Sequence, residues 1–237
     1  MQRLKESSLM DKLLILCGGE GKRLQEIWKL PKVLCPVGPI TYLEFILNNL
    51  KDYFCFSDIT LSVGKNSYLI REFIESKRID VDVINEKTPL GTGGAILNFM
   101  NSKSIQRTAV LNGDTLISKN DLNIFFNESD SYSGNLLAIA KVKENDSRYG
   151  SVLFDPFLRI QKPIVKKYAD VVYAGLCTLN CQSVPQNTKF PMSLEDLLHH
   201  AQLNVKDTKL IEFQNGFHDI GTPKDLYSVA TWLKNNS

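Results

Sequence analysis

The sequence predicts an α/β fold with a mixed, mostly parallel sheet flanked by helices. Three observations support this prediction. Short aliphatic runs alternate with segments of helical periodicity, glycine-rich or polar clusters follow several of the runs, and 237 residues suffice for one large core. We expect a single domain over residues 1–237, in which a first half (about 12–130) carries the main ligand site and a second half (about 131–237) completes it.

The first half alternates strands with helices. The aliphatic run Leu13–Leu16 predicts the first strand, and Thr41–Leu50 predicts a helix packed on it because its apolar residues recur at helical spacing. The same reasoning predicts further strands at Asp58–Val63, Asp80–Ile84 and Thr108–Leu111, and further helices at Tyr68–Ser76 and from Gly94 to Met100. Strands joined through helices pair in parallel, so we expect helices on both faces of the sheet.

The second half has a more antiparallel character. Strands with turns between them are predicted at Asn135–Val142, Gly150–Phe154 and Val171–Leu179. A helix is expected at Ser193–Ala201, with Ser193 as its N-cap, followed by a short strand at Phe217–Ile220 and a closing helix at Pro223–Leu233.

Composition excludes several classes of protein. A net charge of +2 gives no reason to expect nucleic acid or membrane partners, and no apolar run approaches the ~20 residues that span a bilayer. The five cysteines are scattered and lack zinc-ligand spacing, so we expect neither a disulfide nor a metal role for them. The first twelve residues are too polar for a secretory signal, and we therefore expect a cytoplasmic protein.

A glycine-rich turn follows the first predicted strand. Gly18, Gly19 and Gly21 fall within four positions, and the cations Arg23 and Lys32 follow them. Glycines allow backbone N–H groups to approach an anion closely, and a helix that begins after such a turn adds a partial positive charge. The pattern predicts a phosphate cradle, although a glycine-rich turn without a ligand is a common alternative.

Two aspartates are candidate metal ligands. Asp114 directly follows a predicted strand, within Asn112-Gly113-Asp114, and an aspartate there could also serve simply to form a turn. Asp219 lies inside a short apolar run, where a carboxylate is costly unless it is paired or binds a metal. Ligands of open α/β sheets bind beyond the carboxyl ends of the strands, and two carboxylates on separate loops there suit Mg²⁺.

A second glycine-rich stretch runs from Glu86 to Ile96. Its proline and glycines fix a loop whose backbone can lie against a flat base, and the open alternative is a glycine-rich helix start without a ligand. Lys162 is a further cation of interest, for which an exposed surface lysine is the alternative.

The glycine turn and Pro31-Lys32 resemble the Gly-Gly-x-Gly-Thr-Arg-Leu…Pro-Lys signature of the sugar-1-phosphate nucleotidyltransferases, with Lys22 in the place of the threonine. The resemblance extends from about Leu13 to Leu226. It implies a Rossmann-like fold of the nucleotide-diphospho-sugar transferase type, with a nucleotide-binding half and an acceptor-binding half. It also implies Mg²⁺ as cofactor, a nucleoside triphosphate and a sugar 1-phosphate as substrates, and is compatible with a homodimer.

The resemblance assigns roles to individual residues. Arg23 and Lys32 are expected to act in catalysis on the phosphates, and Asp114 and Asp219 to bind the metal. The nucleotide-binding residues implied are Cys17, Gly18, Gly19, Gly21, Lys22, Glu86, Pro89, Gly91, Thr92, Gly93, Gly94, Asn112 and Gly113. The acceptor-binding residues implied are Lys162, Ala174, Gly175, Glu195 and Thr222.

The stretch Pro-Leu-Gly-Thr-Gly-Gly-Ala-Ile resembles the base-recognition loop of guanylyltransferases that act on mannose-type or heptose 1-phosphates. We therefore expect guanylyl transfer from GTP to D-glycero-D-manno-heptose 1-phosphate or mannose 1-phosphate, with release of pyrophosphate. Two alternatives stay open. Replacements relative to the family at Lys22, Gln161 and Tyr173 allow a cytidylyltransferase acting on a non-sugar phosphate, and a non-catalytic nucleotide-sensing subunit is disfavoured by the intact set of cations and carboxylates.

Overall fold

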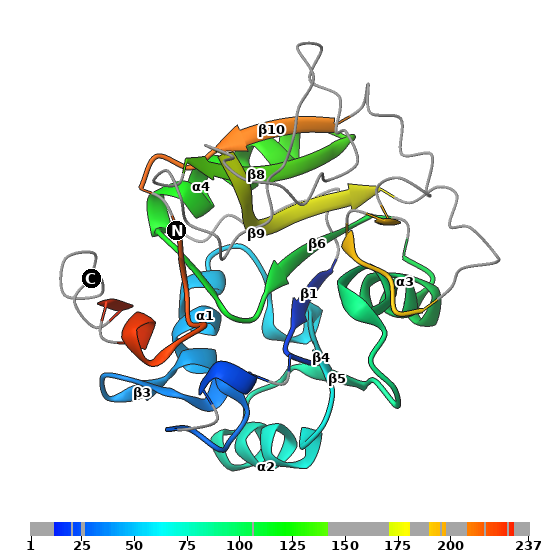
Figure 1. Ribbon diagram of the computed structural model, residues 1–237. Coiled ribbons are helices and arrows are strands. Elements are labelled where there is room, and N and C mark those ends of the chain that lie inside the picture. The colour runs from blue at the N-terminus through cyan, green and yellow to red at the C-terminus, as the bar shows by residue number, and fades with distance from the viewer. Residues whose placement is uncertain are drawn as a thin grey trace.

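The computed structural model describes residues 12–19, 21–24, 27–105, 107–141, 171–180, 190–194, 196–197, 208–215, 217–226 and 228–229. A central sheet of seven strands has the order β10-β8-β9-β6-β1-β4-β5 (Figure 1). Its strands are β1 (Leu13–Leu16), β4 (Ile59–Val63), β5 (Asp82–Asn85), β6 (Arg107–Asn112), β8 (Asn135–Lys141), β9 (Val171–Asn180) and β10 (Thr208–Glu212).

Most neighbouring strands of this sheet are parallel. β1 pairs in parallel with β4 and β6, β4 with β5, and β8 with β10. β9 runs antiparallel to both of its neighbours, β6 and β8. The predicted mixed, mostly parallel sheet is therefore confirmed, and the antiparallel character of the second half resides in β9.

Two smaller sheets complete the described strands. β2 (Pro36–Val37) pairs with β3 (Ile40–Thr41), and β7 (Thr115–Ile117) pairs with β11 (Phe217–Asp219), both antiparallel. The described residues also form three short 3-10 helices, η1 (Lys22–Leu24), η2 (Lys32–Leu34) and η3 (Phe56–Asp58).

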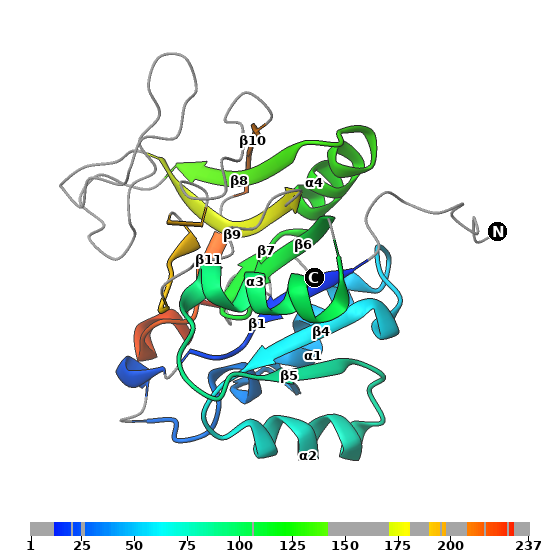
Figure 2. The same ribbon diagram turned by 90° about the vertical axis from the view of Figure 1, so that its right-hand side faces the viewer.

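Four longer helices that the structure describes in full cover the two faces of the large sheet: α1 (Tyr42–Leu50), α2 (Ser67–Lys77), α3 (Gly91–Lys103) and α4 (Lys119–Ser131). In Figure 1, α1 and α4 lie on one side of the sheet and α3 on the other, and the turned view of Figure 2 places α3 in front of the strands. The alternation of side chains along β1 explains both layers. Leu13 and Ile15 belong to the core under α1, α2 and α4, whereas Leu14 belongs to the core under α3.

Local sequence fixes where two of these helices begin. The Thr41 side chain accepts a hydrogen bond from the backbone N–H of Glu44, and the Glu44 side chain accepts one from the N–H of Thr41, which forms a capping box at the start of α1. At α4, the Ser118 hydroxyl accepts a hydrogen bond from the N–H of Asp121.

The predicted elements are largely confirmed, with particular differences. Strand β1 has the predicted bounds, and α1, β4, α2, β5, β6, β8, β9 and β11 differ from the predicted ranges by no more than two residues at either end. Helix α3 begins at Gly91 rather than Gly94, and α4, β2, β3, β7 and β10 were not predicted. The predicted strand Gly150–Phe154 lies outside the described residues, and the last two predicted helices are described only in part.

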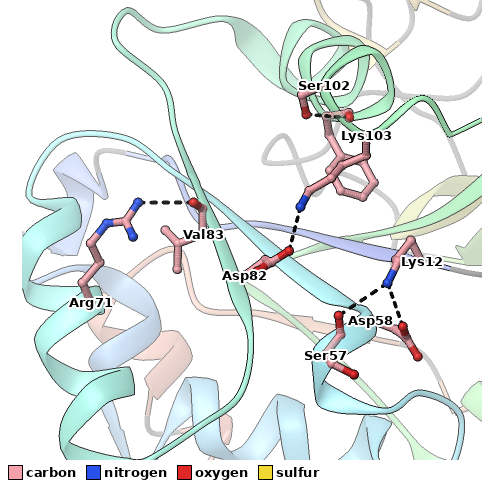
Figure 3. Close-up of polar contacts among 9 residues, drawn as sticks. Lys12, Ser57, Asp58, Arg71, Asp82, Val83, Ser102 and Lys103 are labelled. Atoms are coloured by element: carbon pink, nitrogen blue, oxygen red, sulfur yellow. Dashed lines mark hydrogen bonds and ion pairs between the residues drawn. The ribbon is translucent and has the colours of Figure 1, made fainter.

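Ion pairs mark the edge of the sheet at which the parallel strands begin. Figure 3 shows Lys12, just before β1, paired with Asp58 at 2.7 Å, and Lys103 at the end of α3 paired with Asp82 at 2.8 Å. Such exposed pairs contribute at most about 1 kcal/mol each to stability. Among the helices that the structure describes, none has the length and apolar character needed to cross a membrane.

Candidate active site

Three segments meet at the opposite edge of the sheet. They are the glycine turn after β1, the second glycine-rich stretch after β5, and the residues Gly113 and Asp114 after β6. Backbone hydrogen bonds join all three to neighbouring strands: the N–H of Cys17 donates to the carbonyl of Ser62 at 2.7 Å, that of Glu86 to the carbonyl of Val63 at 2.8 Å, and that of Gly113 to the carbonyl of Leu16 at 3.0 Å. A Cβ atom on Gly113 would lie 2.6 Å from the Leu16 oxygen, so glycine is required for this close approach. The convergence of these segments agrees with the usual place of a ligand in an open α/β sheet.

In the glycine turn after β1, one glycine has a backbone conformation that favours glycine, and another has open space around it. Gly21 has a φ of +60°, which favours glycine, whereas a Cβ atom on Gly19 would meet nothing within 4 Å. A single 3-10 turn, η1, follows instead of a long helix. The helix dipole expected here is therefore small, and an anion at this turn would depend on backbone N–H groups and side-chain cations.

Arg23 follows the turn and lies against the segment that carries Asp219. A Cβ atom on Gly221 would lie 3.5 Å from Nη2 of Arg23. The structure therefore places the Arg23 guanidinium beside a segment that is distant in sequence. The side chain of Lys22 lies outside the described part of the chain.

Lys32 and Asp114 form an ion pair in the middle of this edge. Nζ of Lys32 lies 2.7 Å from Oδ2 of Asp114, and the lysine side chain is only 15% exposed against 39% for the aspartate. The pair brings together two residues that the sequence assigned to different tasks, one to the phosphates and one to the metal.

Asp219 reaches the same place through the pairing of β11 with β7. Asp219 is the partner of Thr115 in this register, and the Thr115 hydroxyl donates a hydrogen bond of 2.6 Å to Oδ1 of Asp219. The N–H of Ile220 donates to the carbonyl of Asp114 at 2.9 Å. The two predicted metal ligands are therefore neighbours, although more than a hundred residues separate them in the sequence.

The electrostatics of this pair are unusual. Burial raises the pKa of Asp219 to about 7, and the negative charge of Asp114 adds to the shift, while the Thr115 hydrogen bond and Lys32 oppose it. A bound divalent cation would reduce the repulsion between two carboxylates in this partly buried place. Within the described residues no group of three or more His, Cys, Asp or Glu side chains converges as a metal site.

Burial also raises the pKa of the Cys17 thiol, and Asp114 raises it further. A thiol held protonated is a poor nucleophile, so Cys17 contributes to the turn through its backbone rather than through thiolate chemistry.

Glu86 lies between the two glycine-rich stretches. Its Oε1 accepts a hydrogen bond of 2.8 Å from the Ser62 hydroxyl, and its Oε2 accepts one of 3.2 Å from the N–H of Leu90. A Cβ atom on Gly18 would lie 2.9 Å from the same Oε1, so the carboxylate rests against the glycine turn. Pro89 and Thr92 flank this arrangement at the start of α3.

The glycines at the start of α3 make room for another part of the protein. A Cβ atom would lie 2.3 Å from the Met192 oxygen at Gly91, 2.2 Å from the Ser193 oxygen at Gly93, and 2.7 Å from the Phe190 ring at Gly94. The N–H of Gly93 donates to the Met192 carbonyl at 2.9 Å. The sequence predicted a contact with a base and did not reveal this packing. The contact with a base stays a prediction, and the N–H of Gly93 already has a protein acceptor.

The predicted acceptor-binding residues are only partly described. Ala174 is buried in β9, and Gly175 has a φ of +78° and allows β9 to approach the Thr115 side chain. The hydroxyl of Thr222 accepts a hydrogen bond of 3.4 Å from the N–H of Asp225, and Oδ2 of Asp225 accepts one of 2.6 Å from the N–H of Thr222, so Thr222 caps the following helix. Lys162 and Glu195 lie outside the described residues.

Comparison with known proteins identifies the family. A sequence model described as nucleotidyl transferase matches residues 12–236. The chain belongs to the nucleotidyl transferase family. It is therefore an enzyme of the nucleotidyltransferase class, as the sequence predicted.

Individual relatives of this nucleotidyltransferase match over nearly their full length. The D-glycero-alpha-D-manno-heptose 1-phosphate guanylyltransferase of Campylobacter jejuni is 31% identical over 226 residues, covering 90% of this chain and 96% of the relative. The enzyme of the same name from Aneurinibacillus thermoaerophilus is 28% identical, covering 93% and 97%. The crystal structure of HddC from Yersinia pseudotuberculosis has a TM-score of 0.76 at 28% identity and covers 94% of this chain and 100% of its own. HddC has also been solved in complex with GMP-PN.

Proposed function

We propose that this nucleotidyltransferase transfers a guanylyl group from GTP to a sugar 1-phosphate, with D-glycero-D-manno-heptose 1-phosphate favoured and mannose 1-phosphate as the next choice. The observation that carries the proposal is the meeting of Lys32, Asp114 and Asp219 at one edge of the sheet. The two relatives described above support the choice of substrates, since both are named as guanylyltransferases of that heptose phosphate.

The chemistry needs charge neutralisation and alignment more than proton transfer. A phosphate oxygen of the sugar 1-phosphate attacks the α-phosphorus of GTP, the new P–O bond forms, and the bond to the β-phosphate bridging oxygen breaks with its electron pair leaving on pyrophosphate. The attacking oxygen is already ionised at neutral pH, so no general base is required. Lys32 would stabilise the charge on the α-phosphate, and Arg23 that on the departing pyrophosphate.

Asp114 and Asp219 are the proposed ligands of Mg²⁺. Hard carboxylate oxygens suit this ion, which commonly takes one or two carboxylates together with phosphate oxygens and water. The raised pKa of Asp219 supports the assignment, because burial and the charge of Asp114 leave an excess of negative charge that a cation would neutralise. When bound, Mg²⁺ would supply charge neutralisation at the phosphates.

The remaining predicted residues complete the proposal. Glu86 offers an acceptor-only carboxylate, and guanine is the common base whose Watson–Crick edge presents two adjacent donors, the N1–H and the 2-amino group. Asn112, Gly113 and the glycine turn would line the triphosphate, and Lys162 and Glu195 would hold the acceptor. GTP and sugar phosphates are cytoplasmic metabolites, so we assign the enzyme to that compartment, and a homodimer stays a prediction.

Pyrophosphate release tests the proposal. The chain is mixed with Mg²⁺ and each of GTP, CTP, UTP, ATP and dTTP, in turn with D-glycero-D-manno-heptose 1-phosphate and mannose 1-phosphate. We expect release with GTP and at least one of the two sugar phosphates. Release with CTP, or the absence of release with every sugar phosphate, would instead favour a non-sugar acceptor and contradict the proposed substrates.

A further inference from the structure

Ser62 is a polar residue inside an otherwise apolar, fully buried strand end. It lies between Leu61 and Val63 near the end of β4, and its exposed fraction is 1%. A buried hydroxyl lowers stability unless it forms hydrogen bonds, so the hydrogen-bond partners of Ser62 indicate its role. No role follows for Ser62 from the glycine motifs or the aspartates of the sequence.

The two polar groups of Ser62 bind the two loops that flank it. Its carbonyl accepts a hydrogen bond of 2.7 Å from the N–H of Cys17, at the start of the glycine turn. Its hydroxyl donates a hydrogen bond of 2.8 Å to Oε1 of Glu86, at the start of the second glycine-rich stretch. One residue therefore links the proposed phosphate loop to the proposed base loop.

The Glu86 carboxylate is held on several sides. The Leu90 N–H binds its other oxygen, and Gly18 packs against the oxygen that Ser62 binds. Rotation about the last torsion of a glutamate is otherwise soft, because this torsion has broad minima. The hydroxyl of Ser62 is the side-chain donor that fixes the plane of the carboxylate, and each oxygen keeps lone pairs for a ligand.

We propose that Ser62 is a positioning residue that sets base selection by holding the Glu86 carboxylate in the plane that accepts both donors of guanine. This inference rests on the proposed function. Without the hydroxyl, the carboxylate would keep the Leu90 bond and swing about it, which weakens the two-point contact with guanine. The contact with a base that has one donor fewer would be weakened less.

ITP is the probe for this inference, because hypoxanthine lacks the 2-amino group of guanine and is otherwise the same base. The ratio of kcat/KM for GTP to that for ITP is measured for the wild type and for Ser62→Ala. Both values come from one preparation, so the ratio does not depend on the fraction of folded enzyme. We expect the ratio to fall about three- to tenfold in Ser62→Ala, mainly through KM for GTP, as for the loss of one hydrogen bond.

Two further variants separate positioning from a general structural role. Glu86→Gln replaces one acceptor by a donor and should lower the ratio more than Ser62→Ala does. The double variant Ser62→Ala/Glu86→Gln should then be no worse than Glu86→Gln alone, because Ser62 acts through Glu86. Ser129→Ala is the matched control, since it removes a buried serine hydroxyl that binds Arg107, near the opposite end of β6. It should leave the ratio unchanged.

The outcomes distinguish this inference from the proposed function. An unchanged GTP to ITP ratio in Ser62→Ala, with an active wild type, overturns the role of Ser62 and leaves guanylyl transfer intact. Fully additive effects of the two substitutions also overturn it. A wild-type chain that prefers another nucleoside triphosphate overturns the proposed function, and the base-selection role of Ser62 with it.

Discussion

Nζ of Lys32 lies 2.7 Å from Oδ2 of Asp114, at the edge where η2 meets the turn between β6 and β7. The same lysine also opposes the rise in the pKa of Asp219. It therefore neutralises part of the charge of two carboxylates that are close to each other. Asp114 and Asp219 would hold a divalent cation, whose charge would neutralise both carboxylates and leave the ammonium group of Lys32 available for a phosphate.

Replacement of Lys32 by methionine keeps most of the side-chain volume and removes the charge. We expect Lys32→Met to lower kcat for pyrophosphate release about 100-fold or more, because the proposed function assigns this charge to stabilising the transition state. Lys103→Met is the matched control, since Lys103 pairs with Asp82 at the other edge of the sheet (Figure 3). Its activity should stay within about twofold of wild type. Equal activity of both variants would remove Lys32 from the catalytic set.

The raised pKa of Asp219 predicts how Mg²⁺ binding depends on pH. Below about pH 7 the cation must displace a proton from this carboxyl, so the affinity for Mg²⁺ should rise about tenfold per pH unit up to pH 7 and then level off. Titration calorimetry from pH 5.5 to 8.5 measures this. The same affinity at pH 6 and pH 8 would contradict the prediction, and Asp82→Asn, at the other edge, should keep the wild-type profile.

The raised pKa of Asp219 also predicts how the free energy of unfolding without metal depends on pH. Between its ordinary value near 4 and about 7, the native Asp219 binds more protons than the unfolded chain does. Its contribution to the free energy of unfolding therefore falls as the pH rises through this range. Asp219→Asn should remove that part of the decline in melting temperature.

Local patterns were sufficient for the elements whose boundaries lie in the sequence itself. Strand β1 is an aliphatic run that ends at a glycine turn, and the Thr41–Glu44 capping box starts α1. Helix α4 was missed because only a narrow stripe of its surface is apolar, although Ser118 and Asp121 already carry the capping pattern. The start of α3 was misplaced because glycine is a poor helix former, and the packing of residues 190–193 against it cannot be seen locally.

The same division holds for the candidate site. Asp114 and Asp219 could be named because each lies in a recognisable motif, and the pairing of β7 with β11 brings them together. Ser62, Thr115 and Met192 were not named, because their importance lies in contacts with residues far away in the chain. For Ser62, the available signal was that a serine lies in a fully buried strand, where polar side chains are uncommon.

The packing of the glycines predicts a contrast between two alanine substitutions. Gly93→Ala places a methyl group 2.2 Å from the Ser193 carbonyl oxygen, so the backbone at one of these two positions would have to move. We expect it to lower the free energy of unfolding by about 1–3 kcal/mol, measured by urea denaturation. Gly19→Ala has open space around the new methyl group, so its stability should change by less than about 1 kcal/mol while GTP binding weakens. The opposite pattern would mean that the glycine turn is structural and the second stretch is exposed to the ligand.

The contacts of Asp121 predict that the position of Asp219, the second proposed metal ligand, depends on a residue distant in sequence. Its carboxylate is fully buried and accepts hydrogen bonds from the Ser118 hydroxyl at 2.7 Å and from the N–H groups of Gln214 and Asn215 at 2.9 and 3.1 Å. These bonds fix the residues just before β11, and therefore the position of Asp219.

An amide at this position cannot accept from all three donors, so Asp121→Asn leaves a buried N–H group facing another donor. We expect a loss of about 2–4 kcal/mol in the free energy of unfolding and a weaker stabilisation by Mg²⁺, both measured by urea denaturation with and without the ion. Asp52→Asn is the control, because Asp52 forms an exposed ion pair of 2.7 Å with Lys119 near the start of the same helix, and should cost less than about 1 kcal/mol. If Asp121→Asn lowered stability but left the Mg²⁺ effect at the wild-type size, β11 would hold Asp219 in place without this anchor.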